Sequence, residues 1–425
     1  MPVDSPAHDS HWGRVLRPAG RWLVMAAAVV LVWPLRPESA TSVVLPALSP
    51  FIAVASVISV RTVSVLELLA VPVLLLVLVF PRWFCRHGCP VGLLQEVVER
   101  VQPNASRRWL KWPGIGQWLV LLTLGGAVLG YPLFLWLDPL AIFNGFLNAW
   151  RQPIALATLL TGLGLPLLLL LDVVAPRLWC QRICPLGVTQ DMLAWPRRLF
   201  RAKSRCLESD RVAGAMEAHR GRRWFLAAVA GAAGAFAVKA VRGQTPPPLR
   251  PPGSLNEHRF TGVCVRCGNC AQVCPSKIIQ PDFGASGVAG FLTPRLLFDR
   301  DYCREDCHCC NEVCPSSAIA RLSLADKRQR VIGRAVVDLD LCLLAQGCEC
   351  TACIQKCPYQ AIAMESADGG FSNQPGVVLD RCNGCGACEA VCPTQPVRAM
   401  KVQAEADVRS LRDPQGSGAT SLIHP

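Results

Sequence analysis

The sequence predicts two halves of different fold class, an α-helical membrane half and, from residue 258, an α+β half. Three observations predict this division. The composition, 52% hydrophobic and only 17% charged, is too apolar for a soluble protein of 425 residues. Long charge-free runs of membrane-spanning length lie before residue 220. Cysteine recurs at regular spacings between Cys264 and Cys392.

Residues 1–20 form a polar cytoplasmic lead, and residues 21–219 form a membrane domain with about four transmembrane helices. A first apolar run covers residues 22–35. The clearest spans follow it, because each has roughly the 20 apolar residues that cross a bilayer. They are residues 62–80, 115–137 and 154–175.

Residues 42–60 are also charge-free, but they contain Pro46 and Pro50. The prolines favour a surface or re-entrant segment, although membrane helices tolerate proline. Both interpretations stay open at this point.

Lysine and arginine are distributed very unequally among the loops. Residues 81–113 contain six and residues 176–223 contain eleven, whereas residues 37–61 and 132–153 contain one each. Basic loops stay on the cytoplasmic side. The sequence therefore predicts a multi-pass membrane protein whose two basic loops face the cytoplasm. The net charge of +13 indicates orientation and predicts no nucleic-acid partner.

An internal repeat places a C-x3-C-P sequence after each of two spans, in residues 83–95 and 178–190. A proline segment precedes each of these spans, residues 48–51 and 137–140, and is predicted on the opposite membrane face from the C-x3-C-P loops. Both loops are expected on the same membrane face, so their four cysteines can converge on one site. That site could bind a metal or cluster, form a redox dithiol or contact a partner, because C-x3-C-P is a weak ligand pattern alone. The four residues are Cys85, Cys89, Cys180 and Cys184.

Residues 220–242 begin with Arg220, Arg222 and Arg223 and continue as a Gly/Ala-rich run. Paired arginines before x-Phe-Leu resemble a twin-arginine export signal, which predicts the twin-arginine translocase as a partner during export. The alternative is a fifth transmembrane helix with a basic flank. Both interpretations place the following chain outside the cytoplasm, beginning with a proline-rich linker over residues 243–257.

Four cysteine motifs occupy residues 258–400, before a polar tail over residues 401–425. The outer two, which begin at Cys264 and Cys382, read C-x2-C-x2-C-x3-C-P. Bacterial ferredoxins bind [4Fe–4S] clusters with this run, and its fourth cysteine ligates the neighbouring cluster. The middle two, from Cys303 and Cys342, have a longer first gap. Zinc ribbons lack the third cysteine of the run. We therefore predict tandem two-cluster ferredoxin-like modules with four [4Fe–4S] clusters.

Crossed ligation within each pair assigns four cysteines to each cluster. The first cluster takes Cys264, Cys267, Cys270 and Cys314, and the second takes Cys303, Cys307, Cys310 and Cys274. The third takes Cys342, Cys350, Cys353 and Cys392, and the fourth takes Cys382, Cys385, Cys388 and Cys357. In the middle motifs, Cys309 could replace Cys307 or Cys310, and Cys348 could replace Cys342 or Cys350.

On these motifs, the N-terminal half resembles the NapH/MauN-type membrane proteins, which carry paired C-x3-C-P loops. The C-terminal half resembles the NapG/MauM-type periplasmic ferredoxins, which have a twin-arginine signal and the long-gap motif seen at Cys342. The chain resembles a fusion of the two types. NapH-type proteins continue into a cytoplasmic two-cluster domain, whereas residues 191–219 of this chain contain only Cys206.

The resemblance implies that electrons pass from the quinone pool to a periplasmic redox enzyme or cytochrome, such as a nitrate reductase. The chain would then be at most a quinol-dehydrogenase-type subunit of the bacterial inner membrane, with its ferredoxin domain in the periplasm. The alternative is a maturation or assembly factor for such an enzyme.

Quinol oxidation releases protons, and ionisable residues in apolar runs are functional candidates. Glu67 and Asp172 are therefore candidate proton acceptors. The alternative for both is a hydrogen bond that packs helices together or a position at the membrane interface, where Asp172 could be solvated.

Overall fold

The computed structural model describes residues 11–33, 40–101, 113–151, 156–194, 210–241, 247–284, 287–367 and 372–404. Cys206, the start of the lead and nearly all of the polar tail lie outside these ranges. The chain forms two compact units. The first unit comprises Met1–Val241, His258–Asn269 and Val313–Ala318, and the second comprises Arg242–Glu257, Cys270–Glu312 and Ile319–Pro425. Two short segments of the cysteine-rich half therefore fold with the N-terminal half.

Regular structure in the described part of the first unit is helical. Before the first C-x3-C-P copy it comprises α1 (His11–Val32), η1 (Ala40–Val43), α2 (Val44–Ala47), α3 (Pro50–Val60), η2 (Glu67–Ala70) and α4 (Val71–Val79). From that copy to the second it comprises α5 (Trp83–His87), α6 (Pro90–Val101), α7 (Ile115–Val128), η4 (Leu135–Leu137), α8 (Pro139–Ala149), α9 (Leu156–Gly162) and α10 (Gly164–Val174). It ends with η5 (Trp179–Ile183), α11 (Pro185–Leu193), α13 (Asp210–Val241) and α14 (Glu257–Val263).

The helices differ from the predicted continuous spans. The range 115–137 ends its helix at Val128, because Gly130 adopts a positive φ of 77° that a helix cannot continue through. The range 154–175 divides into α9 and α10, and Pro166 lies in the first turn of α10, where a missing N–H is tolerated. Among the described helices, none alone has the length and apolarity to cross a bilayer. Thr41–Ala47 and Pro50–Val60 meet these criteria only together, with a bend of 88° between them.

The two repeat-related proline segments meet in the structure. Ser49 caps α3 by accepting from the Ile52 N–H at 3.4 Å, and Asp138 caps α8 by accepting from the Leu140 N–H at 2.9 Å. Proline follows each cap at the first helical position, which is its favoured place. The Ser49 hydroxyl donates to the Asp138 carboxylate at 2.5 Å. The repeats are therefore joined at their helix starts.

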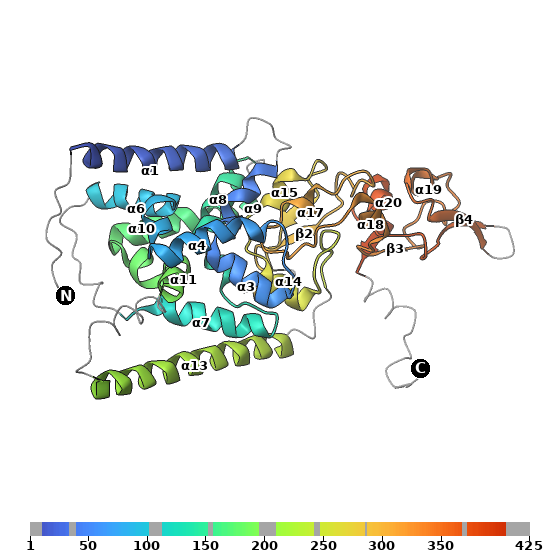
Figure 1. The fold of residues 1–425 in the computed structure, drawn as a ribbon. Coiled ribbons are helices and arrows are strands. Elements are labelled where there is room, and N and C mark those ends of the chain that lie inside the picture. The colour runs from blue at the N-terminus through green and yellow to red at the C-terminus, as the bar shows by residue number, and fades with distance from the viewer. Residues whose placement is uncertain are drawn as a thin grey trace. The chain divides into compact units, whose positions relative to one another are not determined.

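Residues 220–242 largely fall within α13, which runs alongside α7 (Figure 1). A Cβ atom at Gly125 would collide with the carbonyl of Ala228, and one at Gly231 would collide with the carbonyl of Leu122. Only glycine allows two helix backbones to approach this closely. The segment that resembles an export signal is therefore a packed helix of the first unit.

The second unit is α+β, as the sequence predicts. Its first part contains α15 (Asn269–Val273), β1 (Ile279–Pro281), α16 (Gly287–Gly290), β2 (Pro294–Leu296), α17 (Cys309–Glu312) and α18 (Leu324–Gln329). Its second part contains β3 (Arg334–Val337), α19 (Ala352–Lys356), β4 (Ile362–Ala367), β5 (Ser372–Val377), α20 (Ala387–Val391) and β6 (Met400–Gln403).

The strands form three antiparallel pairs, β1–β2, β3–β6 and β4–β5. In the second part, the strands of the β3–β6 pair come first and last in the chain. Helix α19, the β4–β5 pair and helix α20 lie between them in sequence. The first part repeats this order. The isolated bridge between Ser254 and Ile319 takes the place of the outer pair, and β1–β2 is the inner pair. Buried cysteines pack among the apolar side chains of both parts. The unit thus has the repeated organisation expected of two tandem ferredoxin modules.

Candidate metal centres

The cysteines of the two C-x3-C-P loops occupy equivalent places in the first unit. Cys85 lies in α5 and Cys180 in η5, a turn of π-helix. Cys89 and Cys184 directly precede the proline that begins α6 and α11. Backbone N–H groups at the start of these helices point at both sulfurs, from Val91 and Gly92 in the first copy. A helix start of this kind favours a thiolate.

The structure brings the four predicted cysteines together, and we name them the four-thiol site. All four line one cavity of about 660 Å³. None of them forms a disulfide. Arginines from four positions also line the cavity, namely Arg21, Arg82, Arg86 and Arg177. Their positive charge suits an anionic group held by thiolates.

Burial dominates the electrostatics of the four-thiol site. Desolvation and the neighbouring Cys89 raise the pKa of Cys85 to about 12, although Arg82 and a hydrogen bond from Gln190 oppose the shift. Desolvation likewise raises the pKa of Cys89 to about 11. The free thiols are therefore protonated near neutral pH, and a bound metal would displace their protons.

Two glutamines at equivalent positions of the repeat lie at this site. Gln190 is fully buried, and its amide donates to the Cys85 sulfur, in the other repeat, at 3.1 Å. Gln95 is 3% exposed and lines the cavity, and neither its amide nitrogen nor its amide oxygen has a partner. A buried amide without a partner is costly, which indicates that a ligand belongs beside it. The sequence analysis did not single out either glutamine, although both end the repeated segment.

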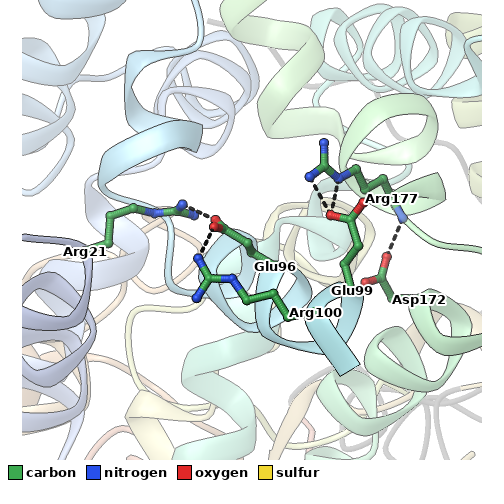
Figure 2. Close-up of polar contacts among 6 residues, drawn as sticks. All are labelled: Arg21, Glu96, Glu99, Arg100, Asp172 and Arg177. Atoms are coloured by element: carbon green, nitrogen blue, oxygen red, sulfur yellow. Dashed lines mark hydrogen bonds and ion pairs between the residues drawn. The ribbon is translucent and has the colours of Figure 1, made fainter. Parts of the chain in front are cut away.

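Asp172, a predicted proton acceptor, lies beside this site. It is 1% exposed, and one carboxylate oxygen accepts from the Arg177 backbone N–H at 2.8 Å while the other has no partner (Figure 2). Burial raises the pKa of the Cys180 thiol, and the nearby Cys89, Cys85 and Asp172 raise it further. The Arg177 side chain is held by Glu99 of α6 at 2.6 Å (Figure 2). Glu96, in the same helix, pairs with Arg100 of α6 and with Arg21 of α1 (Figure 2).

Glu67, the other predicted proton acceptor, lies in η2 and not among the residues that line the four-thiol cavity. Its carboxylate accepts from the Ser64 N–H at 2.9 Å and from the Ser317 hydroxyl at 3.1 Å. Ser317 follows Cys314 closely in sequence, so Glu67 supports the loop of a predicted cluster ligand. These contacts agree with the packing alternative for Glu67.

Three of the four cysteines assigned to the first ferredoxin cluster also lie in the first unit. They are Cys264, Cys267 and Cys314. Burial raises the pKa of the Cys267 thiol, and the nearby Cys314 and Cys264 raise it further. The N–H of Asn269 donates to the Cys267 sulfur. The helical unit therefore contains cysteines of both the C-x3-C-P and the ferredoxin type.

The second unit brings together cysteines assigned to the second cluster and cysteines assigned to the fourth, and it also contains Cys270 of the first set. The Cys310 thiol is buried beside Cys303, Cys274 and Cys307, and these neighbours raise its pKa after desolvation. Cys388 is likewise surrounded by Cys385, Cys382 and Cys357.

The cysteines assigned to the third cluster also lie together. Cys353 lies near Cys342 and Cys350, and Cys342 packs with Cys350 and Cys392. The surplus cysteines Cys309 and Cys348 are both exposed. In the described part of the chain, no group of His, Cys, Asp or Glu side chains is arranged to hold a single metal ion.

Comparisons with known proteins agree with iron–sulfur binding at both kinds of motif. Residues 62–113 and 155–203, one range for each C-x3-C-P copy, match the family described as "4Fe-4S binding domain". Residues 346–396 match the family described as "4Fe-4S dicluster domain". No solved structure matches the chain.

Several ferredoxin-type proteins are relatives of this chain. The ferredoxin-type protein NapG of Escherichia coli (strain K12) is 39% identical over 192 residues, which is 40% of this chain and 81% of NapG. The methylamine utilization ferredoxin-type protein MauM of Methylobacillus flagellatus is 35% identical over 182 residues, 40% of this chain and 71% of MauM. The ferredoxin-type protein NapF of Escherichia coli (strain K12) is 34% identical over 157 residues, 37% of this chain and 87% of NapF.

These matches confirm the predicted resemblance of the cysteine-rich half to NapG and MauM, while the resemblance to NapH and MauN stays a prediction. Because the alignment covers most of the length of NapG at 39% identity, the relationship extends beyond the cysteine motifs. The chain belongs to the family of ferredoxin-type iron–sulfur proteins that includes NapG and MauM.

Proposed function

We propose that the chain is a membrane-anchored electron-transfer protein that passes electrons from the quinol pool to a periplasmic redox enzyme. The observation that carries this proposal is that the first unit contains both the four-thiol site and three of the four cysteines assigned to the first ferredoxin cluster. Such a unit can join a donor at the membrane to the ferredoxin modules.

The proposal includes five [4Fe–4S] clusters, one more than the four predicted from the sequence, and the match of both C-x3-C-P ranges to a 4Fe-4S binding family supports the fifth. Four use the ferredoxin motifs with the crossed ligands predicted from the sequence. The fifth uses Cys85, Cys89, Cys180 and Cys184, where the unpartnered Gln95 and the bond from Gln190 to the Cys85 sulfur fit a thiolate-bound cluster. Bound clusters supply one-electron chemistry at a potential set by charge and by hydrogen bonds to sulfur.

The residues around the four-thiol site suit this role. Arg82 lies close enough to Cys85 and Cys184 to be influenced by both, so it offsets negative charge there. Asp172 is the proposed proton acceptor, since one of its buried oxygens has no partner and it lies near Cys180. Glu67 is proposed only to hold the Cys314 loop.

The proposed location is the bacterial inner membrane, with the ferredoxin modules in the periplasm. The basic loops, with six and eleven Lys or Arg, support a cytoplasmic position for the C-x3-C-P loops. Export of the folded ferredoxin half would allow clusters to be loaded in the reducing cytoplasm, because an oxidising compartment promotes disulfides among free cysteines.

The function is tested with anaerobically purified protein in lipid. We expect about twenty iron atoms per chain, four for each of five clusters. A quinol analogue should reduce the clusters at catalytic rates in EPR, and a periplasmic acceptor should reoxidise them. If iron is present but quinol never reduces it, and the chain is needed only while its partner enzyme is being built, the maturation factor replaces this proposal.

Export is tested by replacing both Arg222 and Arg223 with lysine. The twin-arginine pathway reads the arginine pair itself, so the ferredoxin half should stay inside and protected from protease added to spheroplasts. The matched control replaces Arg107 and Arg108, another arginine pair in a basic loop, with lysine. This control should leave the ferredoxin half as accessible to protease as in the wild type. Normal exposure of the Arg222 and Arg223 variant would exclude this export route.

A further inference from the structure

Helix α8 contacts the four-thiol site at its first turn. Its cap Asp138 is fully buried and lies close enough to Cys89 to raise the pKa of that thiol. Pro139, the first residue of α8, lines the four-thiol cavity. The start of this helix is therefore part of the wall of the site.

Two asparagines farther along α8 contact the first ferredoxin motif. Asn144 and Asn148 are four residues apart and so lie on the same helix face. The Asn144 amide donates to the Cys267 carbonyl at 3.0 Å and to the Asn269 side-chain oxygen at 2.7 Å. The Asn148 amide donates to the same two oxygens at 3.0 and 2.9 Å. We call these four hydrogen bonds the asparagine clamp.

The clamp is buried and reaches both segments of the cysteine-rich half that fold with the first unit. Asn144 and Asn269 are fully buried, and Asn148 is 2% exposed. The Asn269 amide also donates to the carbonyl of Val313, directly before Cys314, at 3.4 Å. The side-chain oxygens of Asn144 and Asn148 have no partner, so both asparagines are held through their amide nitrogens.

The clamp holds the residue whose backbone contacts the cluster ligand. The Asn269 N–H donates to the Cys267 sulfur, and hydrogen bonds to sulfur help to set the potential of an iron–sulfur cluster. Fixing Asn269 through its side chain and the preceding loop through the Cys267 carbonyl keeps that N–H aimed at the sulfur. A looser loop would weaken the hydrogen bond from the Asn269 N–H to the Cys267 sulfur. Because that bond stabilises the more negative, reduced cluster, its loss would lower the midpoint potential.

We propose that Asn144 and Asn148 are positioning residues of the first ferredoxin site, and that α8 fixes the separation of this site from the four-thiol site. The helix rises about 14 Å from Pro139 to Asn148, which is nine steps along the helix. One rigid element therefore holds a wall of one redox site and the loop of the other. This inference rests on the proposed function, which assigns clusters to both sites.

The test replaces Asn144 and Asn148 with alanine in the full chain, singly and together. Redox titration with dithionite and mediators, followed by EPR, should show one cluster with a lower midpoint potential and the others unchanged. We expect the oxidised-to-reduced ratio of that cluster at a fixed potential to rise about tenfold in the double variant, which is 59 mV for one electron. Asn148→Ser, which keeps a hydroxyl donor and the intact Asn144, should shift less.

Ser56→Ala is the matched control. Ser56 is fully buried in the same unit, but its hydroxyl bonds only to carbonyls of its own helix α3. It should leave every potential unchanged. If the double variant loses iron, the single variants decide the question through the same titration.

An unchanged potential in the iron-replete variants would overturn the inference, and so would an equal shift in the Ser56 variant. The titration uses a chemical reductant, so it does not depend on quinol. Failure of quinol to reduce the wild-type protein would count against the proposed function alone.

Discussion

Serine at both Cys85 and Cys184 is expected to remove about four iron atoms per chain, one cluster's content. Each substitution takes one ligand from one repeat, and the two remaining thiols cannot hold a four-iron cluster. The cavity of about 660 Å³ would then contain only water and side chains. Iron and acid-labile sulfide analysis of anaerobically purified protein measures the loss, and EPR shows which signal disappears.

Cys309→Ser is the matched control for this experiment. The Cys309 side chain is exposed, whereas Cys310 beside it is buried among three other assigned ligands. The control should keep its full iron content and all signals. Full iron content in the Cys85 and Cys184 double variant would show that the C-x3-C-P loops hold no cluster, which leaves a redox dithiol or a partner contact for them.

Leucine at Gly231 is expected to separate α13 from α7. Even a Cβ atom at this position would collide with the Leu122 carbonyl, and backbone cannot move aside as a flexible side chain can. Overpacking typically costs about 1–3 kcal/mol, and a clash with backbone belongs at or above the upper end. A lower thermal midpoint in detergent and faster proteolysis within residues 210–241 would report the change.

Gly221→Ala provides the control within the same helix. Gly221 is exposed, and an added Cβ there meets nothing within 4 Å. Alanine should stabilise the helix by about 0.5–1 kcal/mol, because glycine loses more backbone freedom on folding. If Gly231→Leu proves as stable as the wild type, α13 is not packed in the mature protein, and a cleaved export signal becomes the better interpretation.

The cysteine spacing made the ferredoxin half predictable from the sequence. Motifs such as the one from Cys264 to Cys274 are local, and the chemistry of cluster binding fixes their spacing. The repeat made the four-thiol site predictable in part, since two equivalent loops on one membrane face can converge on one site. The comparisons and the structure agree with these local inferences.

Long-range packing was not predictable from the sequence. Hydropathy shows where apolar residues lie but does not show that Gly130 ends a helix or that residues 258–269 fold with the first unit. Asn144 and Asn148 were missed because hydropathy averages hide two polar residues in an apolar run. Their four-residue spacing was the available signal, since it places both amides on one face.

The hydrogen bond between Ser49 and Asp138 joins the two repeats through unlike residues. Two identical copies of one repeat would place serine against serine or aspartate against aspartate at this buried contact. The first pair lacks a charged acceptor, and the second repels unless it binds a proton. Unlike caps therefore make the copies complementary to each other and unsuited to self-association. When the two halves of the helical unit are expressed separately, each should therefore associate with the other half in preference to a second copy of itself.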